Sequence, residues 1–147
     1  EADREFTLIE LMMVIAIIGC LSATIRAGLA TSRNKGNDAS IQSNLTTAKT
    51  QIELYFVNNN QSYGTAMALG TCPSSGTTVF YADVTTRAAI AQAAANSAGT
   101  VQCVVGTGFW VIQSPLKTGN YWCVDHRGGG RLRTSVLSGS PTACPTP

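Results

Sequence analysis

The hydrophobic positions near the N-terminus form one nearly continuous run. No charged residue occurs over 11–25, and three of the four residues just before Glu10 are also apolar. A helix that crosses a bilayer needs roughly 20 such residues. Glu10 lies near the end of the run, where a carboxylate can reach the headgroups and costs less than at the membrane centre. The pattern predicts a hydrophobic helix over residues 6–27 that crosses a membrane or packs among other helices.

Beyond Arg26 the chain becomes polar but keeps a periodic apolar stripe. Its members follow at spacings of 4, 3, 4, 3 and 1 residues: Ile41, Leu45, Ala48, Ile52, Tyr55 and Phe56. This spacing fits the 3.6-residue period of a helix with one apolar face. Since no proline precedes Pro73, we expect one helix over 7–57, ended by the asparagines 58–60. Its second part, 28–58, is expected to continue the helix amphipathically and to pack on a globular domain.

Residues 59–147 are expected to form that globular head domain. Glycine and proline predict a loop over 61–78, and 79–82 is expected to be a short strand or an extended stretch. An alanine-rich segment predicts a helix over 86–96, with Thr85 or Thr86 as its cap.

The remaining segments are rich in β-branched and aromatic residues and are separated by glycine and proline. They predict four strands: 101–105, 108–113, 120–125 and 131–136. Such spacing is typical of an antiparallel meander. We therefore expect an α+β fold, in which a long N-terminal helix, apolar in its first half, packs on a small antiparallel β-meander.

Composition restricts the function. Only 12% of the residues are charged, against about 25% in an average protein. With 44% hydrophobic residues, this low charge excludes intrinsic disorder. A net charge of +2 argues against a protein that binds nucleic acid mainly by charge. One histidine and eight carboxylates leave little material for a metal or acid–base enzyme, so we expect no enzymatic activity, no metal and no cofactor.

His126 is the candidate general base or metal ligand. Asp125 lies beside it in sequence, but adjacent residues of a strand point to opposite faces. Cys123 and His126 have a spacing found in zinc sites, yet a second close ligand pair is missing from the sequence. We expect His126 to be an exposed turn residue.

The segment Phe6-Thr7-Leu8-Ile9-Glu10, followed by the apolar run with Gly19, resembles the start of a mature type IV pilin or pseudopilin. The resemblance is close over 6–25 and looser along the helix to about residue 58. It implies that a prepilin peptidase cuts before Phe6 and that the new N-terminus is methylated. It also implies that Glu10 takes part in assembly, by pairing with the amine at a neighbouring subunit's helix N-terminus.

Two features of the N-terminal region depart from that pattern. Residues 1–5 are acidic and lack glycine, whereas the family's leader is basic and ends in glycine. We interpret them as a leader remnant or an altered N-terminus. The residues 17–20 (Ile-Ile-Gly-Cys) resemble a lipobox, but the acidic region before them fits a signal peptide poorly. Cys20 is therefore expected to be a small apolar residue on a helix-packing face.

The four other cysteines lie in the head domain and allow three pairings. We favour Cys72 with Cys103 and Cys123 with Cys144, each stabilising by about 3–4 kcal/mol in the chain-entropy model. The resemblance supports the second pair, because many pilins close a C-terminal loop with a disulfide.

The arginines around the glycines 128–130 are the candidate interaction surface. Arg127, Arg131 and Arg133 are expected to belong to a solvated hairpin. The alternative is a small basic patch for DNA or another anionic surface, which a filament would repeat many times.

The leading hypothesis is a structural subunit of a type IV pilus-like filament that serves adhesion, motility or DNA uptake. It implies a homo-oligomer that lies in the inner membrane before assembly and in an extracellular filament afterwards. Prepilin peptidase and the pilus assembly machinery are its implied partners.

The first alternative is a pseudopilin or minor pilin of a type II secretion or competence machine. Major pseudopilins often hold calcium near the C-terminus, and Asp83 and Asp125 are too few and too far apart in sequence for such a site. The second alternative is a single-pass membrane-anchored extracellular binding domain.

Overall fold

The computed structural model describes residues 6–145. Residues 1–5, interpreted above as a leader remnant or an altered N-terminus, lie outside the described residues. The chain divides into an N-terminal unit that ends at Asn34 and a C-terminal unit that begins at Lys35. The division falls inside the first helix, so the two units are described one at a time.

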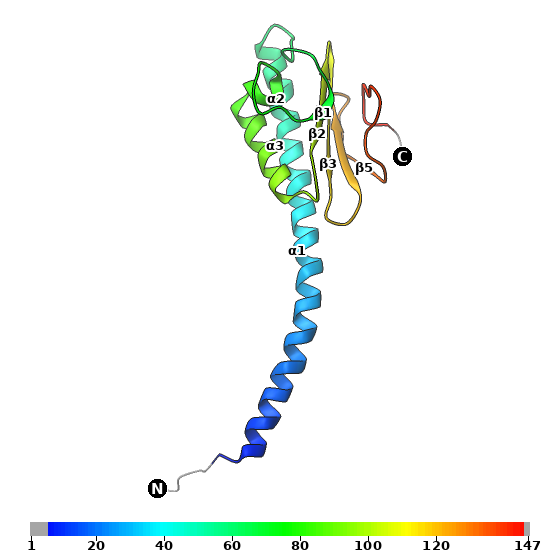
Figure 1. Cartoon of the computed structure of the whole chain (residues 1–147). Helices are drawn as coiled ribbons and strands as arrows, with labels where there is room; N and C mark the ends of the chain where they lie inside the picture. Colours follow the sequence, from blue (N-terminus) through cyan, green and yellow to red (C-terminus); the bar gives the residue numbers. More distant parts are fainter. Residues whose placement is uncertain (1–5, 146–147) are drawn as a thin grey trace. The chain divides into compact units, whose positions relative to one another are not determined.

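Helix α1 spans Leu8–Asn58 and has 51 residues, so the predicted long helix is confirmed (Figure 1). Its C-terminus is closed by backbone bonds to Phe56, whose carbonyl accepts from the N–H of Asn59 at 3.3 Å and of Gln61 at 2.9 Å. Asn60 and Gln61 have positive φ angles of 53° and 57°. A left-handed residue just after the last turn is a common helix end, and asparagine tolerates that conformation.

The C-terminal unit contains a sheet of five antiparallel strands in the order β1-β2-β3-β4-β5. The strands are β1 (Met67–Thr71), β2 (Gln102–Gly106), β3 (Phe109–Pro115), β4 (Tyr121–Asp125) and β5 (Arg131–Arg133). The predicted meander is confirmed for β2 to β5. Strand β1 was predicted as loop, because its sequence has no β-branched residue before Thr71 and contains Gly70. It pairs with β2 through an irregular register between Met67 and Gly70.

Two short-range expectations are wrong. The segment expected to be extended is α2 (Val79–Ala82), a single helical turn whose Val79 and Phe80 are buried. Helix α3 spans Val84–Asn96, and its cap is Asp83, whose Oδ1 accepts from the N–H of Thr86 at 2.6 Å. Thr86 is itself fully buried and therefore belongs to the core rather than to the cap. Burial of aromatic and β-branched side chains has overridden their strand propensity in α2.

Side chains alternate between the two faces of the sheet, and each face has its own hydrophobic cluster. Figure 1 shows α2, α3 and the C-terminal part of α1 on one side of the sheet. On that face the predicted apolar stripe of α1 is buried from Ile41 to Ile52 and partly buried at Tyr55 and Phe56. It packs with Cys103, Val105, Trp110 and Ile112. The opposite face carries a smaller cluster of Val104, Val111, Cys123, Leu137 and Cys144. The strands β2 and β3 are thus covered on both sides, which explains their continuous apolar runs.

Two carboxylates, one buried and one half-buried, connect α1 to the sheet region at two levels. Asp38 is buried and accepts from the backbone N–H of Lys117 at 2.6 Å and from the hydroxyl of Thr118 at 2.7 Å. It thereby holds the turn between β3 and β4. About four turns of helix further on, Glu53 accepts from Nε1 of Trp110 at 2.7 Å and from the hydroxyl of Tyr63 at 3.2 Å. These bonds satisfy polar groups that burial has removed from water, which is what makes the burial tolerable.

The Tyr63 hydroxyl gives the fold a pH dependence. Burial, together with the negative charge of Glu53, raises the pKa of Tyr63 to about 12 from an ordinary 10.0. Between these two values the unfolded chain loses the phenolic proton while the folded chain keeps it, so the folded state loses stability as pH rises. Below pH 10 the contribution of Tyr63 is fully present.

We expect the free energy of unfolding to fall by roughly 1 kcal/mol per pH unit from this group between pH 10 and 12. Urea unfolding of the full chain in detergent micelles measures it. The matched variant is Tyr63→Phe, which lacks the phenol, so its free energy of unfolding should decline less steeply by that amount. Parallel pH profiles for the two proteins would contradict the assignment.

Candidate functional site

The helix surface of the N-terminal unit is apolar and uncovered. Every side chain described over 6–34 is exposed in the isolated chain. Thirteen large hydrophobic side chains are among them, from Phe6 at 82% exposure to Leu29 at 49%. The helix is long and apolar enough to cross a membrane by length and composition. A water-exposed surface of this size is unstable, so this segment requires lipid or other protein helices around it.

Glu10 lies in the first turn of this helix and is part of a capping box. Its Oε2 accepts from the backbone N–H of Thr7 at 3.0 Å and from the Thr7 hydroxyl at 2.9 Å. Thr7 stands immediately before the helix, and its Oγ1 accepts in return from the backbone N–H of Glu10 at 3.4 Å. A reciprocal Thr-x-x-Glu pair satisfies helix N–H groups that would otherwise lack partners. The carboxylate is therefore hydrogen-bonded within the single chain.

Sequence reasoning missed the role of Thr7. The signal was present, since a serine or threonine three residues before Glu and just ahead of an apolar run is the signature of a capping box. Phe6 precedes the cap. Cys20 is exposed on the apolar helix, and the geometry around it tests neither the lipobox nor the packing interpretation.

The C-terminal tail, defined here as residues 134–145, covers the second face of the sheet without forming a helix or strand in its described part. A disulfide between Cys123 of β4 and Cys144 closes it, as the sequence predicted. Leu137 of the tail is buried in the smaller hydrophobic cluster. A second disulfide joins Cys72, just after β1, to Cys103 of β2.

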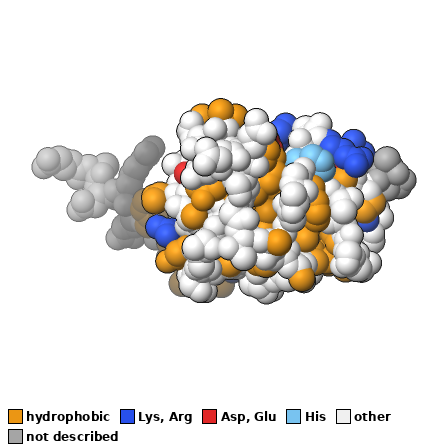
Figure 2. Space-filling view, turned by 90° about the horizontal axis from the view of Figure 1, so that it is seen from above, with side chains coloured by type: hydrophobic (Ala, Val, Ile, Leu, Met, Phe, Trp, Pro, Cys, Tyr) orange, Lys and Arg blue, Asp and Glu red, His pale blue; other side chains and the backbone are white. Residues whose placement is uncertain are grey.

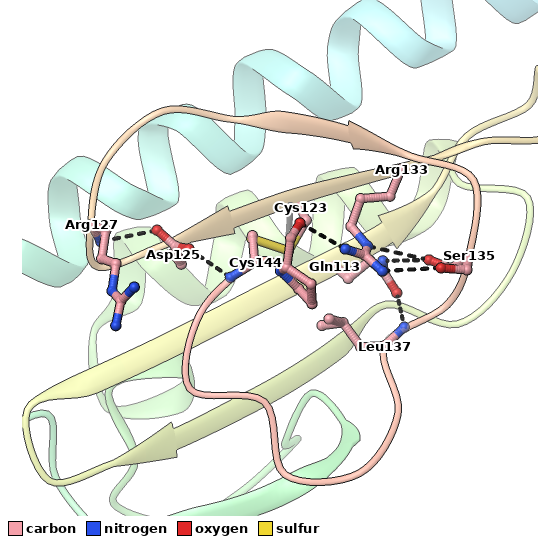
Figure 3. Close-up of a disulfide and its surroundings, with 9 residues drawn as sticks. Gln113, Cys123, Asp125, Arg127, Arg133, Ser135, Leu137 and Cys144 are labelled. Atoms are coloured by element: carbon pink, nitrogen blue, oxygen red, sulfur yellow. Dashed lines mark hydrogen bonds between the residues drawn. A yellow bond between two sulfur atoms is a disulfide. The ribbon is translucent and has the colours of Figure 1, made fainter. Parts of the chain in front are cut away.

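Side chains from three strands hold the backbone of this tail (Figure 3). Gln113 of β3 accepts from the N–H of Leu137 at 2.7 Å and donates to the carbonyl of Ser135 at 3.1 Å. Asp125 of β4 accepts from the N–H of Cys144 at 2.6 Å. Arg133 of β5 donates through Nη1 to the carbonyl of Pro145 at 2.7 Å. These long-range bonds replace the strand pairing that the tail lacks. No local sequence pattern predicts them.

We expect Gln113→Leu to loosen the tail without unfolding the sheet. The variant keeps side-chain volume but leaves the Leu137 N–H and the Ser135 carbonyl without partners, at a cost of about 1–3 kcal/mol. Hydrogen exchange at Leu137 should accelerate, while exchange in β2 and β3 stays slow. Equal acceleration in the tail and the strands would show that the tail is not a separate unit.

The structure separates the three arginines that the sequence grouped together. Arg133 is only 9% exposed, and its guanidinium binds the tail. It is therefore neither the solvated hairpin residue that was expected nor part of an exposed basic patch. Arg127 is exposed and Arg131 is half-buried. On the face shown in Figure 2, lysine and arginine side chains gather beside the histidine.

His126 was expected to be an exposed turn residue, but in the structure it is half-buried. Its Nδ1 is buried and has no hydrogen-bond partner within residues 6–145. Cys123 is already bound in a disulfide, so it is not a zinc ligand in this structure. No group of three or more potential metal ligands occurs in the described part of the chain.

These features define a class of protein. A long N-terminal helix that is apolar in its first half, followed by an antiparallel sheet with a disulfide-closed C-terminal loop, is the arrangement expected of a type IV pilin. The chain is 32% identical, over 142 residues, to the type IV wide pilus major component PilA4 of Thermus thermophilus. The match covers 97% of both chains. The chain belongs to the type IV pilin family, and its role in the pilus is structural.

No protein-family model and no solved structure matches the chain. The family assignment therefore rests on this relative, and the fold supports it independently.

Proposed function

We propose that this chain is the major, repeating subunit of an extracellular type IV pilus that serves adhesion, motility or DNA uptake. The observation that carries the proposal is the uncovered apolar helix surface, with Glu10 in its first turn. In the inner membrane, lipid covers this helix; in a filament, the same helices of neighbouring copies cover it. The relative is a major pilus component, which favours the repeating rather than the initiating position for this chain.

The apolar side chains alone do not favour the filament over the membrane. Each would gain about 1.5–3 kcal/mol on leaving water, but lipid and a helix bundle both remove it from water. Close packing between helices supplies part of the free-energy difference between the membrane and the filament. A charge pair that exists only between subunits supplies another part, and Glu10 is the residue placed to form it.

Glu10 is proposed to exchange its hydrogen bonds with Thr7 for a contact with a neighbouring subunit. In the single chain the Thr7 bonds make the carboxylate tolerable in lipid. In the filament, the ammonium at a neighbouring helix N-terminus would pair with Glu10 and fix the axial register between copies. At about 4 Å and an effective dielectric constant of about 20, two unit charges attract by about 4 kcal/mol.

That ammonium has to be released by cleavage before Phe6. Phe6 lies outside regular secondary structure and is 82% exposed, which supports its role as the first residue after the cleavage. Cleavage by a prepilin peptidase and methylation of Phe6 are parts of the proposal.

Electron microscopy of material sheared from producing cells, with mass spectrometry of the same fraction, tests the proposal. We expect thin filaments composed chiefly of this chain, with a subunit mass that begins at a methylated Phe6. Filaments of another protein, with this chain present in traces, would identify a minor pilin or pseudopilin. A chain that stays in the membrane fraction would identify a membrane-anchored domain and refute the filament role.

A further inference from the structure

The four carboxylates described in the C-terminal unit are all engaged inside the protein. Asp38 and Asp125 are buried, and Glu53 and Asp83 are half-buried. Each accepts at least one hydrogen bond from its own unit. The negative charge of the head is therefore directed inward, and the charge left on its surface is positive.

A groove lies where this positive charge meets the C-terminal tail. Its volume is about 580 Å³, within the ~300–1,000 Å³ range of small-ligand sites. Two arginines line it, together with three hydroxyls of the tail: Arg127, Arg131, Ser138, Ser140 and Thr142.

The two groove arginines have unused donors. Among residues 6–145, neither the Arg127 nor the Arg131 guanidinium donates a hydrogen bond or forms an ion pair. Asp125 is bonded to the backbone N–H of Arg127 and not to its guanidinium. In Figure 3 the Arg127 guanidinium points away from Asp125, beside the tail that leads to Cys144. Lys49 lies beside the turn between the two arginines, since a Cβ at Gly128 would lie 3.7 Å from its Nζ.

Asp125 also lines the groove, and its charge opposes an anion. Its Oδ1 accepts from the N–H of Arg127 at 2.9 Å and its Oδ2 from the N–H of Cys144 at 2.6 Å. Both oxygens are thus turned to the backbone, and the residue is buried. The carboxylate builds the groove wall and leaves the guanidinium groups to the ligand.

We propose that this groove binds an acidic polysaccharide, with a carboxylate or sulfate of one sugar unit on Arg127 and Arg131. Arginine presents paired N–H donors that fit such groups bidentately. The hydroxyls of Ser138, Ser140 and Thr142 are exposed and match the hydroxyls of a sugar ring. A filament would repeat the groove along its surface, so a long polysaccharide would bind many copies with high avidity.

The lining of the groove favours a saccharide over a single-stranded nucleic acid. Proteins that hold single strands stack the bases on aromatic side chains. No aromatic residue lines this groove in the described structure. Serine, threonine and arginine provide hydrogen bonds to an acidic sugar but no stacking surface for a base.

The probe is fluorescent hexagalacturonate, and its fully methyl-esterified form is the uncharged control. Binding is measured by anisotropy, both to the full chain in detergent micelles and to sheared filaments. The test variant is Arg127→Gln with Arg131→Gln. The matched variant, Arg87→Gln with Lys117→Gln, removes two exposed positive charges outside the groove. Circular dichroism checks that both remain folded.

We expect the unmodified chain to bind the acidic hexamer and not its ester. The groove variant should bind at least about tenfold more weakly, and the matched variant less than about twofold. Equal losses in the two variants would mean unspecific attraction and overturn the proposal. So would tighter, arginine-dependent binding of an oligothymidylate of equal charge, or the absence of binding by both micelles and filaments.

The avidity, but not the site, depends on the proposed function. If the chain formed no filaments, the micellar protein would still bind the hexamer through its groove. Failure of this inference and failure of the filament role therefore give different results.

Discussion

Filaments are expected to decrease at least about tenfold when Glu10 is replaced by glutamine. Glutamine keeps an oxygen that can accept from Thr7, so the helix start is preserved while the charge is lost. Losing an attraction of about 4 kcal/mol between subunits exceeds the 1.4 kcal/mol that corresponds to a factor of ten. Quantitative mass spectrometry of sheared and membrane fractions measures the shift, and we expect the variant to accumulate in the membrane.

Thr7→Val is the matched control for that experiment. It removes the Thr7 hydroxyl from the capping box and leaves the carboxylate in place. Loss of a cap costs about 0.5–2 kcal/mol, confined to the first turn, and filaments should persist. The opposite pattern, with filaments from Glu10→Gln and none from Thr7→Val, would show that Glu10 acts as a helix cap and not as an assembly charge.

Truncation of Trp110 is expected to cost about 3–5 kcal/mol of folding stability. Trp110 is the largest fully buried side chain of the head and packs between the sheet and α1. Trp110→Ala leaves a cavity and also removes the N–H that donates to Glu53. Because a domain of this size is stable by only about 5–15 kcal/mol, the variant should unfold at much lower urea concentration.

Two further variants separate the causes. Trp110→Phe keeps most of the apolar area and loses the hydrogen bond, so we expect a smaller loss of about 1–3 kcal/mol. Val84→Ala changes a residue that is 65% exposed and should stay within about 0.5 kcal/mol of the unmodified chain. A Trp110→Ala variant as stable as Val84→Ala would contradict the packing described for α1.

The elements with a regular pattern were predictable from the sequence. The apolar run and the stripe from Ile41 to Ile52 repeat often enough to define one helix, and glycine and proline separate the strands β2 to β4 clearly. The structure confirms both, together with the disulfide that closes the tail. The family was predicted from the resemblance of the N-terminal segment to type IV pilins, and the relative confirms it.

The errors occur where a tertiary contact decides the local structure. Strand β1 has little strand propensity of its own and is ordered by pairing with β2. Val79 and Phe80 form a helical turn because that turn buries both. Arg133 looks like a surface residue in sequence, but the tail returns to cover it from positions 12 residues further along. Contacts between residues so far apart in sequence produce no periodic pattern from which they could be predicted.

The two edges of the sheet have a consequence for a protein that exists as many identical copies side by side. Exposed strand edges carry unpaired N–H and C=O groups and recruit the edges of other chains into continuous sheets. Here one edge is β5, which has three residues, and the other is β1, whose register is interrupted between Met67 and Gly70. Short or irregular edges are poor templates for such pairing. Heads crowded at high local concentration are thereby kept from joining edge to edge, so association is left to the helices and aggregation of the heads is avoided.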